Sequence, residues 1–116
     1  MRIHHIGYLV KSIEKAKDSF LSIGFSVKQE ITYDEIRDIN ILFMEKDGYL
    51  IELINPNSKE SVVANLIKTY KNSPYHICYE TENFDSDAKG LIDRGFMRID
   101  QPTPAPALNG RHVCFL

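Results

Sequence analysis

The sequence has no tryptophan, only two cysteines and no apolar run that approaches the length of a membrane span. Cys78 and Cys114 lie far apart without Cys-x-x-Cys spacing, so neither a disulfide framework nor a zinc ribbon is indicated. A membrane-spanning helix needs about 20 consecutive apolar residues. The chain also enters a strand pattern at Ile3 without a signal-like apolar segment before it. We therefore expect a cytoplasmic protein with no membrane partner.

An excess of charge of one sign is also missing. The chain has 14 Lys and Arg against 16 Asp and Glu, which gives a net charge of −2. Proteins that bind nucleic acid usually present a basic surface, so a nucleic-acid partner is disfavoured. The hydrophobic fraction of 43% is ordinary for a globular protein, and 116 residues suit a single domain.

An internal repeat is the most informative feature that is present. When the sequence is shifted by 71 residues, identical residues coincide at several positions and no gap is needed. Five of the coinciding pairs are His5 with His76, Ile6 with Ile77, Tyr8 with Tyr79, Gly24 with Gly95, and Phe25 with Phe96. These identities fall where a strand, a helix end and a following strand are expected. The chain therefore contains two copies of one module.

The first copy has the pattern of a strand, a helix and three further strands. Residues 3–10 are β-branched, aromatic and apolar, which predicts a strand. Ser12 is a typical N-cap residue, and Gly24 ends the following helical periodicity. An Asp-Gly turn joins the last two strands. The three further strands are predicted over residues 25–31, 40–45 and 49–54.

The second copy follows the same order but ends earlier. A strand is predicted over residues 75–81 and a helix from about residues 83–85 to Gly95. Further strands are predicted over residues 96–100 and 112–116, with a proline-rich loop between them. At the same offset, the fourth strand of this copy would lie beyond Leu116. We therefore expect the last strand to be absent from this sequence.

Together these elements predict an α+β fold with two tandem βαβββ modules that form one curved mixed sheet. The modules comprise about residues 1–56 and 73–116, and a short helical linker at residues 63–70 joins them. All of residues 1–116 then form a single domain.

Glu52 is the residue that suggests chemistry. It lies within the apolar strand Tyr49–Ile54, where burial of a carboxylate costs several kcal/mol unless a cation or hydrogen bonds compensate. If the sheet curves so that its strands line one cleft, then His5, Glu52 and His76 converge there. Two imidazoles and one carboxylate suit Ni, Co, Zn or Fe, and tolerate Mn or Mg less well.

Structural roles for these residues are the alternative. A single strand histidine is more often a hydrogen-bonded core or edge residue than a ligand, and Glu52 would face water if one side of the sheet is wet. The repeat favours the metal site, because equivalent positions of a duplicated module meet near its pseudo-twofold axis. His4 has Tyr75 as its counterpart, so we interpret it as an ordinary strand residue, and His112 as structural.

The repeated module and three segments resemble the vicinal oxygen chelate superfamily, which includes glyoxalase I, methylmalonyl-CoA epimerase, extradiol dioxygenases and bleomycin-resistance proteins. The segments are HIGYLV from His5, IELINP around Glu52 and YHICYE around His76. The resemblance covers essentially the whole chain and is strongest to the epimerase and glyoxalase I branch. It implies His5, Glu52 and His76 as metal ligands and Glu52 as a candidate catalytic base.

The resemblance also implies features that this sequence does not supply. A fourth ligand, a glutamate equivalent to Glu52, would fall at position 123, beyond Leu116. The epimerases use a second acid/base glutamate on the third strand, where the nearest residues here are Asp38 and Asn40. Arg111 is a candidate partner for an anionic group of the substrate, although a solvated surface arginine is the more ordinary assignment.

The function implied is that of a divalent-metal-dependent lyase or isomerase with Ni, Co, Zn, Mn or Fe as its cofactor. Its substrate would be a small thioester or hemithioacetal that reacts through an enediolate. The alternatives are a small-molecule binding or antibiotic-resistance protein without catalysis, and an Fe(II) extradiol dioxygenase. The resemblance further implies a homodimer.

Overall fold

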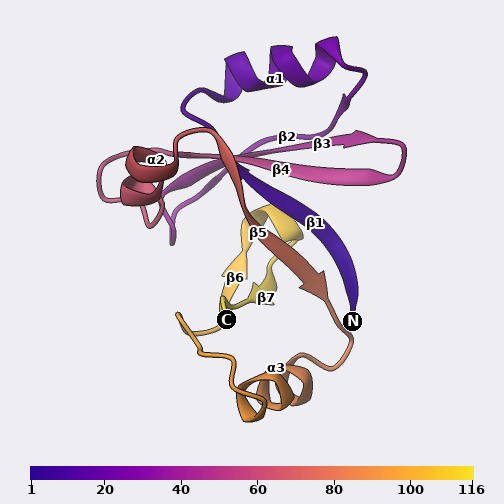
Figure 1. Cartoon of the computed structure of the whole chain (residues 1–116), viewed down its shortest axis with the longest axis vertical. Helices are drawn as coiled ribbons and strands as arrows, with labels where there is room; N and C mark the ends of the chain where they lie inside the picture. The colour runs from indigo at the N-terminus through magenta and orange to yellow at the C-terminus, as the bar shows by residue number, and fades with distance from the viewer.

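A five-stranded mixed sheet forms the centre of the fold (Figure 1). The computed structural model describes all of residues 1–116. The strand order is β2-β3-β4-β1-β5, in which β1 runs parallel to β4 and the other neighbouring pairs are antiparallel. The strands are β1 (Arg2–Leu9), β2 (Ser26–Asp34), β3 (Ile39–Lys46), β4 (Tyr49–Pro56) and β5 (Ser73–Glu80). This arrangement, with the helices described next, confirms the predicted α+β fold.

Three α-helices connect the strands: α1 (Ile13–Ser22), α2 (Ala64–Tyr70) and α3 (Phe84–Asp93). The Ser12 hydroxyl accepts a hydrogen bond from the Lys15 amide at 3.3 Å and so caps α1, as predicted. Two residues after the last residue of α1 lies Gly24, with φ of +98°, and two residues after α3 lies Gly95, with φ of +103°. Only glycine adopts this conformation without strain, so both helices end for the same reason. None of the helices has the length and hydropathy needed to cross a membrane.

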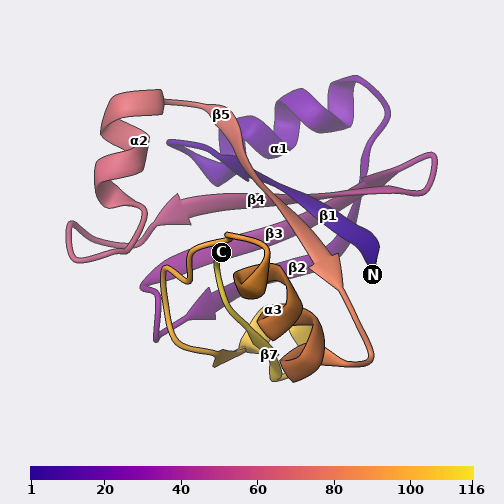
Figure 2. The same cartoon turned by 60° about the horizontal axis from the view of Figure 1, so that its bottom comes forward.

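The repeat of 71 residues recurs in the elements of the structure. β1 covers residues 2–9 and β5 covers residues 73–80, while α1 covers residues 13–22 and α3 covers residues 84–93. The strand and the helix of each copy therefore start and end at equivalent positions. β1 and β5 pair with each other at the middle of the fold, and α1 and α3 lie on opposite sides of this pair (Figures 1 and 2).

The end of the second copy differs from the sequence prediction. Residues 96–100 form no strand, and the segment predicted as a loop contains a short strand and a 3₁₀ turn. The side chains of Phe96, Met97 and Ile99 are more than half exposed. One backbone hydrogen bond, from the Ile99 amide to the Phe115 carbonyl at 2.9 Å, joins this segment to the C-terminal residues. The elements here are β6 (Thr103–Ala105), the 3₁₀ turn Pro106–Leu108 and β7 (Arg111–Val113), and β6 and β7 form a separate two-stranded sheet.

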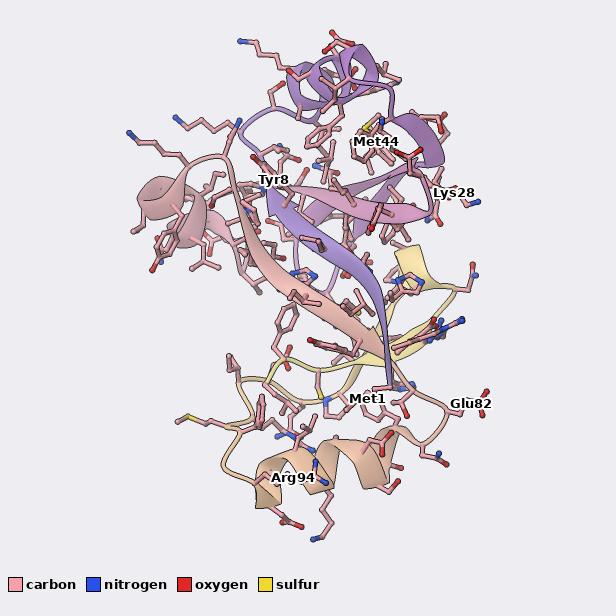
Figure 3. The ribbon with its side chains drawn as sticks, turned by 45° about the vertical axis from the view of Figure 1, so that its right-hand side comes forward. Met1, Tyr8, Lys28, Met44, Glu82 and Arg94 are labelled. Atoms are coloured by element: carbon pink, nitrogen blue, oxygen red, sulfur yellow. The ribbon has the colours of Figure 1, made fainter.

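The core has two parts, one on each face of the sheet, because successive side chains of β3 point to opposite faces. Leu42 and Met44 face α1 and pack there with Val10, Ile13, Ala16 and Leu53 (Figure 3). Ile41 and Phe43 face the other side, where the cluster is completed by Leu9, Ile39, Ile54, Val63, Ile67 and Ala107. The second cluster draws one residue from the 3₁₀ turn and two from the α2 region. It therefore joins the linker and the second module to the sheet.

A buried ion pair also attaches β6 to the first module. Arg37 lies in the turn between β2 and β3, and its guanidinium donates to the Asp34 carboxylate at 2.7 Å. The same guanidinium donates to the Pro104 carbonyl at 3.2 Å and to the Thr103 hydroxyl at 2.5 Å. Asp34 and Arg37 are both buried. Because the charges are paired and further hydrogen-bonded, their desolvation is compensated.

Candidate metal centre

The three predicted ligands come from three neighbouring strands, β4, β1 and β5, of which β5 is the edge strand of the sheet. Gly7 of β1 lies opposite Glu52 of β4 on one side and opposite His76 of β5 on the other. Residues that pair directly across strands point to the same face, and His5 shares that face with Gly7 two residues away. The register therefore brings the side chains of His5, Glu52 and His76 to one place.

Gly7 provides the space that this convergence requires. A Cβ atom built at Gly7 would lie 2.1 to 2.6 Å from three atoms of the His76 imidazole. The ring of His76 thus lies directly over the backbone of β1. Any larger residue at position 7 would displace His76, so glycine is needed here for close approach.

The ligand atoms are close enough to bind one ion. His5 Nε2 lies 2.5 Å from Glu52 Oε2 and 3.1 Å from His76 Nε2, and the three donor atoms lie within 4.8 Å of one another. The side chain of His5 is 2% exposed and that of Glu52 is 9% exposed. The structure therefore brings all three predicted residues together, while their role as metal ligands remains a prediction.

The electrostatics of the three groups are strongly coupled. Burial opposes a positive charge on His5, but hydrogen bonds with Cys78 and Glu52 more than offset it and raise the pKa of His5 to about 9. Burial lowers the pKa of His76 to about 4, despite the opposing attraction of Glu52. Without a metal ion, His5 is therefore a buried imidazolium paired with Glu52, and His76 is neutral near pH 7.

Aromatic rings pack around the imidazoles and fix their planes. The ring centroid of Phe43 lies 5.2 Å from that of His5, and the rings of Tyr75 and Phe115 lie 4.5 Å and 5.4 Å from that of His76. Nδ1 of His76 is buried and has no hydrogen-bond partner. With Nδ1 unpaired, the only polar contacts of His76 are made by Nε2, the atom that faces the other two ligands.

This donor set fits a divalent cation. Two imidazole nitrogens and a carboxylate oxygen are the ligands of many Zn²⁺, Co²⁺, Ni²⁺ and Fe²⁺ sites. An ion held by His5, Glu52 and His76 would also compensate the buried carboxylate, which otherwise depends on protonation of His5.

His4 was interpreted from the sequence as an ordinary strand residue, and the structure corrects this interpretation. Its Nδ1 lies 2.8 Å from Nδ1 of His5, and its ring makes an edge contact with that of Phe43. Strict strand alternation would place His4 on the face opposite His5. A bulge in the pairing of β1 with β5 changes this, and nothing in the residue types near His4 announces a bulge.

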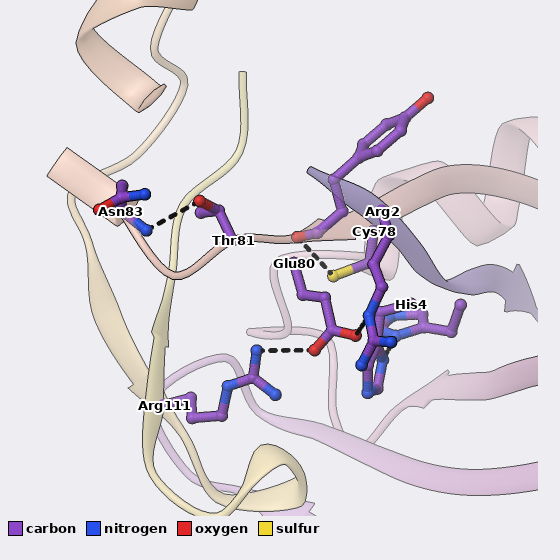
Figure 4. Close-up of polar contacts among 9 residues, drawn as sticks. Arg2, His4, Cys78, Glu80, Thr81, Asn83 and Arg111 are labelled. Carbon is purple, nitrogen blue, oxygen red and sulfur yellow. Dashed lines mark hydrogen bonds and ion pairs between the residues drawn. The ribbon is translucent and has the colours of Figure 1, made fainter. Parts of the chain in front are cut away.

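The other residues considered from the sequence lie outside the cluster. Arg111 is ion-paired with Glu80 at 3.1 Å, and Glu80 also binds Arg2, so that β7, β5 and β1 are joined at the surface (Figure 4). His112 is exposed on β7.

Neither Asp38 nor Asn40 belongs to the cluster. The Asp38 carboxylate accepts hydrogen bonds from Tyr33, Asn57 and Ser58 at the start of β3, and Asn40 pairs with Asn55. The third strand therefore supplies no carboxylate next to His5, Glu52 and His76.

The paired modules and a His/Glu/His cluster on β1, β4 and β5 define a protein of the glyoxalase-like fold. The family model described as Glyoxalase/Bleomycin resistance protein/Dioxygenase superfamily matches residues 4–115, and the chain belongs to this family.

Its relatives include epimerases. The chain is 24% identical over 117 residues to the mitochondrial methylmalonyl-CoA epimerase of Dictyostelium discoideum, covering 99% of this chain and 69% of the relative. The structure of hypothetical protein BH1468 from Bacillus halodurans C-125 is similar, with a TM-score of 0.88, 24% identity and coverage of 98% of this chain and 82% of that one. The structure of methylmalonyl-CoA epimerase from Mycobacterium tuberculosis is also similar, with a TM-score of 0.81 and 15% identity. The match covers 91% of this chain and 73% of the epimerase chain.

Proposed function

We propose that this protein is a divalent-metal-dependent isomerase of the methylmalonyl-CoA epimerase type, with a small acyl thioester as its substrate. The observation that supports this proposal most is the buried Glu52 carboxylate beside the imidazoles of His5 and His76 on the neighbouring strands β4, β1 and β5. The family and the epimerase relatives are consistent with it.

His5, Glu52 and His76 would hold the ion, through two Nε2 atoms and one carboxylate oxygen. When bound, a divalent ion would polarise the carbonyl oxygen of the thioester and so lower the barrier to removing the neighbouring proton. This help is required, because a carbon acid next to a thioester is too weak to lose its proton to a carboxylate near pH 7.

Glu52 is the candidate base in this proposal. Its carboxylate would accept the proton from the carbon next to the carbonyl, a proton from solvent would add to the opposite face and invert that carbon, and the proton held by Glu52 would pass to solvent. No electrons are transferred and no group leaves, so the reaction needs no co-substrate. The rings of Phe43 and Phe115 pack edge-on against the imidazoles of His5 and His76.

A cavity beside the cluster is suited to the acyl part of such a substrate. Its volume is about 190 Å³, and His4 and Phe43, which both contact His5, line it. Lys28 and Arg111 also line it, and their charges are paired with Glu45 at 3.2 Å and with Glu80 at 3.1 Å. A small ligand would find apolar contacts there, while an anionic group would compete with these two carboxylates for the cations.

Metal binding is the first test. The purified protein is stripped of metal and titrated with Zn²⁺ and Co²⁺, and we expect one ion per chain. His5→Ala and His76→Ala should each lose this binding. His112→Ala is the matched control, because His112 is exposed and does not belong to the cluster.

Catalysis is the second test. The metal-loaded protein is incubated with methylmalonyl-CoA in heavy water, and we expect deuterium to enter the carbon next to the carbonyl without oxygen consumption. Glu52→Gln should abolish this exchange. A protein that binds no metal but still binds a small ligand would contradict the proposal and favour the non-catalytic alternative. Oxygen consumption would favour the dioxygenase. The homodimer and the cytoplasmic location stay predictions.

A further inference from the structure

His4 reaches the face of the metal cluster because β1 contains one extra residue relative to β5. In the pairing of the two strands, Ile3 lies opposite Tyr79, and His5 lies opposite Cys78. Between these two pairs the register moves by two residues along β1 and by one residue along β5, so His4 is the inserted residue. A bulge of this kind turns two successive side chains toward the same face.

The bulge brings Nδ1 of His4 into contact with Nδ1 of His5, the ring nitrogen that does not face Glu52 and His76. His4 Nδ1 and His5 Nδ1 are 2.8 Å apart, their ring centroids are 5.1 Å apart, and the ring planes are inclined by 81°. Only one of the two nitrogens can carry the shared proton, since two N–H groups would repel each other. His5 Nε2 points toward Glu52 and His76, so a ligand lone pair on Nε2 requires the proton on Nδ1.

From this geometry we propose that His4 is a positioning residue, which accepts a hydrogen bond from Nδ1–H of His5 and thereby holds His5 in the tautomer and orientation that binds a metal ion through Nε2. The inference rests on the proposed function, because it requires a metal at this cluster. Partners of this kind on ligand histidines typically change metal affinity by about 10- to 100-fold.

The second histidine offers an internal comparison. A second bulge lies where Gly7 pairs with His76 and Tyr8 pairs with Pro74, so Tyr75 is the inserted residue of β5. Tyr75 is the residue equivalent to His4 under the repeat, yet Nδ1 of His76 has no hydrogen-bond partner. Both copies therefore contain a bulge at the equivalent position, but only the first copy places a hydrogen-bond acceptor, His4, next to Nδ1 of its cluster histidine.

The test compares His4→Phe with His4→Gln in the full chain. The phenylalanine keeps the size of the ring without an acceptor, whereas the glutamine supplies a carbonyl oxygen. Zn²⁺ affinity is measured by competition with a chelating dye, and the Co²⁺ absorption spectrum reports the ligand geometry. We expect His4→Phe to bind Zn²⁺ about 10- to 100-fold more weakly with an altered Co²⁺ spectrum, and His4→Gln to recover most of the affinity.

His112→Phe is the matched control for removal of a histidine and should bind Zn²⁺ like the wild type. A second measurement does not require metal: proton NMR of the metal-free protein should show a slowly exchanging Nδ1–H of His5 that His4→Phe removes. Unchanged affinity in His4→Phe, or a wild type without this protected proton, would overturn the inference. If the wild type binds Zn²⁺ and His4→Phe weakens it, but no deuterium exchange occurs, the proposed function fails and the role of His4 stands.

Discussion

The two halves of the molecule share one pattern but differ in how much they bury. In residues 1–56, large apolar side chains from β1, α1, β3 and β4 are fully enclosed. In residues 73–116, the buried apolar residues are Ala88, Ala105 and Ala107. Hydrophobic periodicity therefore indicates most of the strands and helices in both halves, whereas burial depends on the neighbours that each segment finds.

The helices illustrate this difference. Ile13 and Ala16 of α1 are buried against Leu42 and Met44 of β3, whereas only Ala88 of α3 is buried. Packing rather than propensity supplies most of the stability of a short helix. The first half should therefore dominate the free energy of unfolding, and the second half should depend on its attachments to the first.

The largest expected effect concerns the main polar attachment. Arg37→Met removes the cation that pairs with buried Asp34 and binds Thr103 and Pro104, so an unpaired carboxylate is left in the interior. We expect a loss of about 3–5 kcal/mol in the free energy of unfolding, measured with urea. Amide exchange in residues 103–113 should also become faster.

Lys89→Met is the matched control within the second half. Lys89 forms an i,i+4 pair with Asp93 on α3, and both side chains are more than half exposed. Its replacement should change the free energy of unfolding by at most about 0.5 kcal/mol. Equal effects of the two substitutions would show that Arg37 does not join the halves energetically.

Shortening an apolar side chain should lower the free energy of unfolding more in the first half than in the second. Leu53→Ala creates a cavity beneath α1, because Leu53 is fully buried in the cluster that faces this helix. We expect it to cost about 2–5 kcal/mol. Met97→Ala removes a side chain that is 78% exposed, and should cost less than about 0.5 kcal/mol. Thermal or urea unfolding of both variants checks this, and comparable losses would contradict the assignment of the core to the first half.

Much of the fold could be predicted because its signals are local. Ser12 and Gly24 indicated the ends of α1 through capping and αL geometry, and the repeat carried the same limits to β5 and α3. The convergence of His5, Glu52 and His76 was also predicted, since it depends on strand parity and on the relation between the copies.

What failed depends on non-local pairing. The apolar residues 96–100 have the composition of a strand, but a strand needs a series of backbone hydrogen bonds to a neighbour, and only the Ile99 amide donates to the C-terminal residues, at the Phe115 carbonyl. The position of His4 depends on a bulge, which is a mismatch between β1 and β5 that neither strand shows alone. Both errors arise where a segment's partner, rather than its own sequence, decides its structure.

The pairing of His5 with Glu52 predicts a pH dependence of the metal-free protein. The pKa of His5 is raised from 6.5 to about 9 in the folded state, so its contribution to stability is complete below pH 6.5 and is lost as the pH rises through 9. This contribution is on the order of 3 kcal/mol. Urea unfolding from pH 6 to 10 should show the decline in the wild type and a flatter profile in His5→Gln. Parallel profiles would mean that His5 is not charged in the metal-free fold.

The smallest expected effect comes from a substitution at Gly7, where the His76 ring of the second copy lies over β1 of the first copy. Gly7→Ala places a Cβ within 2.6 Å of the His76 ring, so the ring must leave its 3.1 Å contact with His5. Displacement of one ligand should weaken Zn²⁺ binding by about 10- to 100-fold, or about 1.4–2.8 kcal/mol.

Gly90→Ala in α3 is the control, because a Cβ there has no atom within 4 Å and alanine favours the helix. It should leave Zn²⁺ affinity unchanged and raise stability by up to about 1 kcal/mol. The residue equivalent to Gly7 in the second copy is Cys78, so only one of the two central strands keeps a glycine at this point. A glycine is needed only at position 7, because the His76 ring lies over the β1 backbone there. If Gly7→Ala binds Zn²⁺ as tightly as the wild type, His76 does not need the position above β1 and the ligand geometry derived from the strand register is wrong.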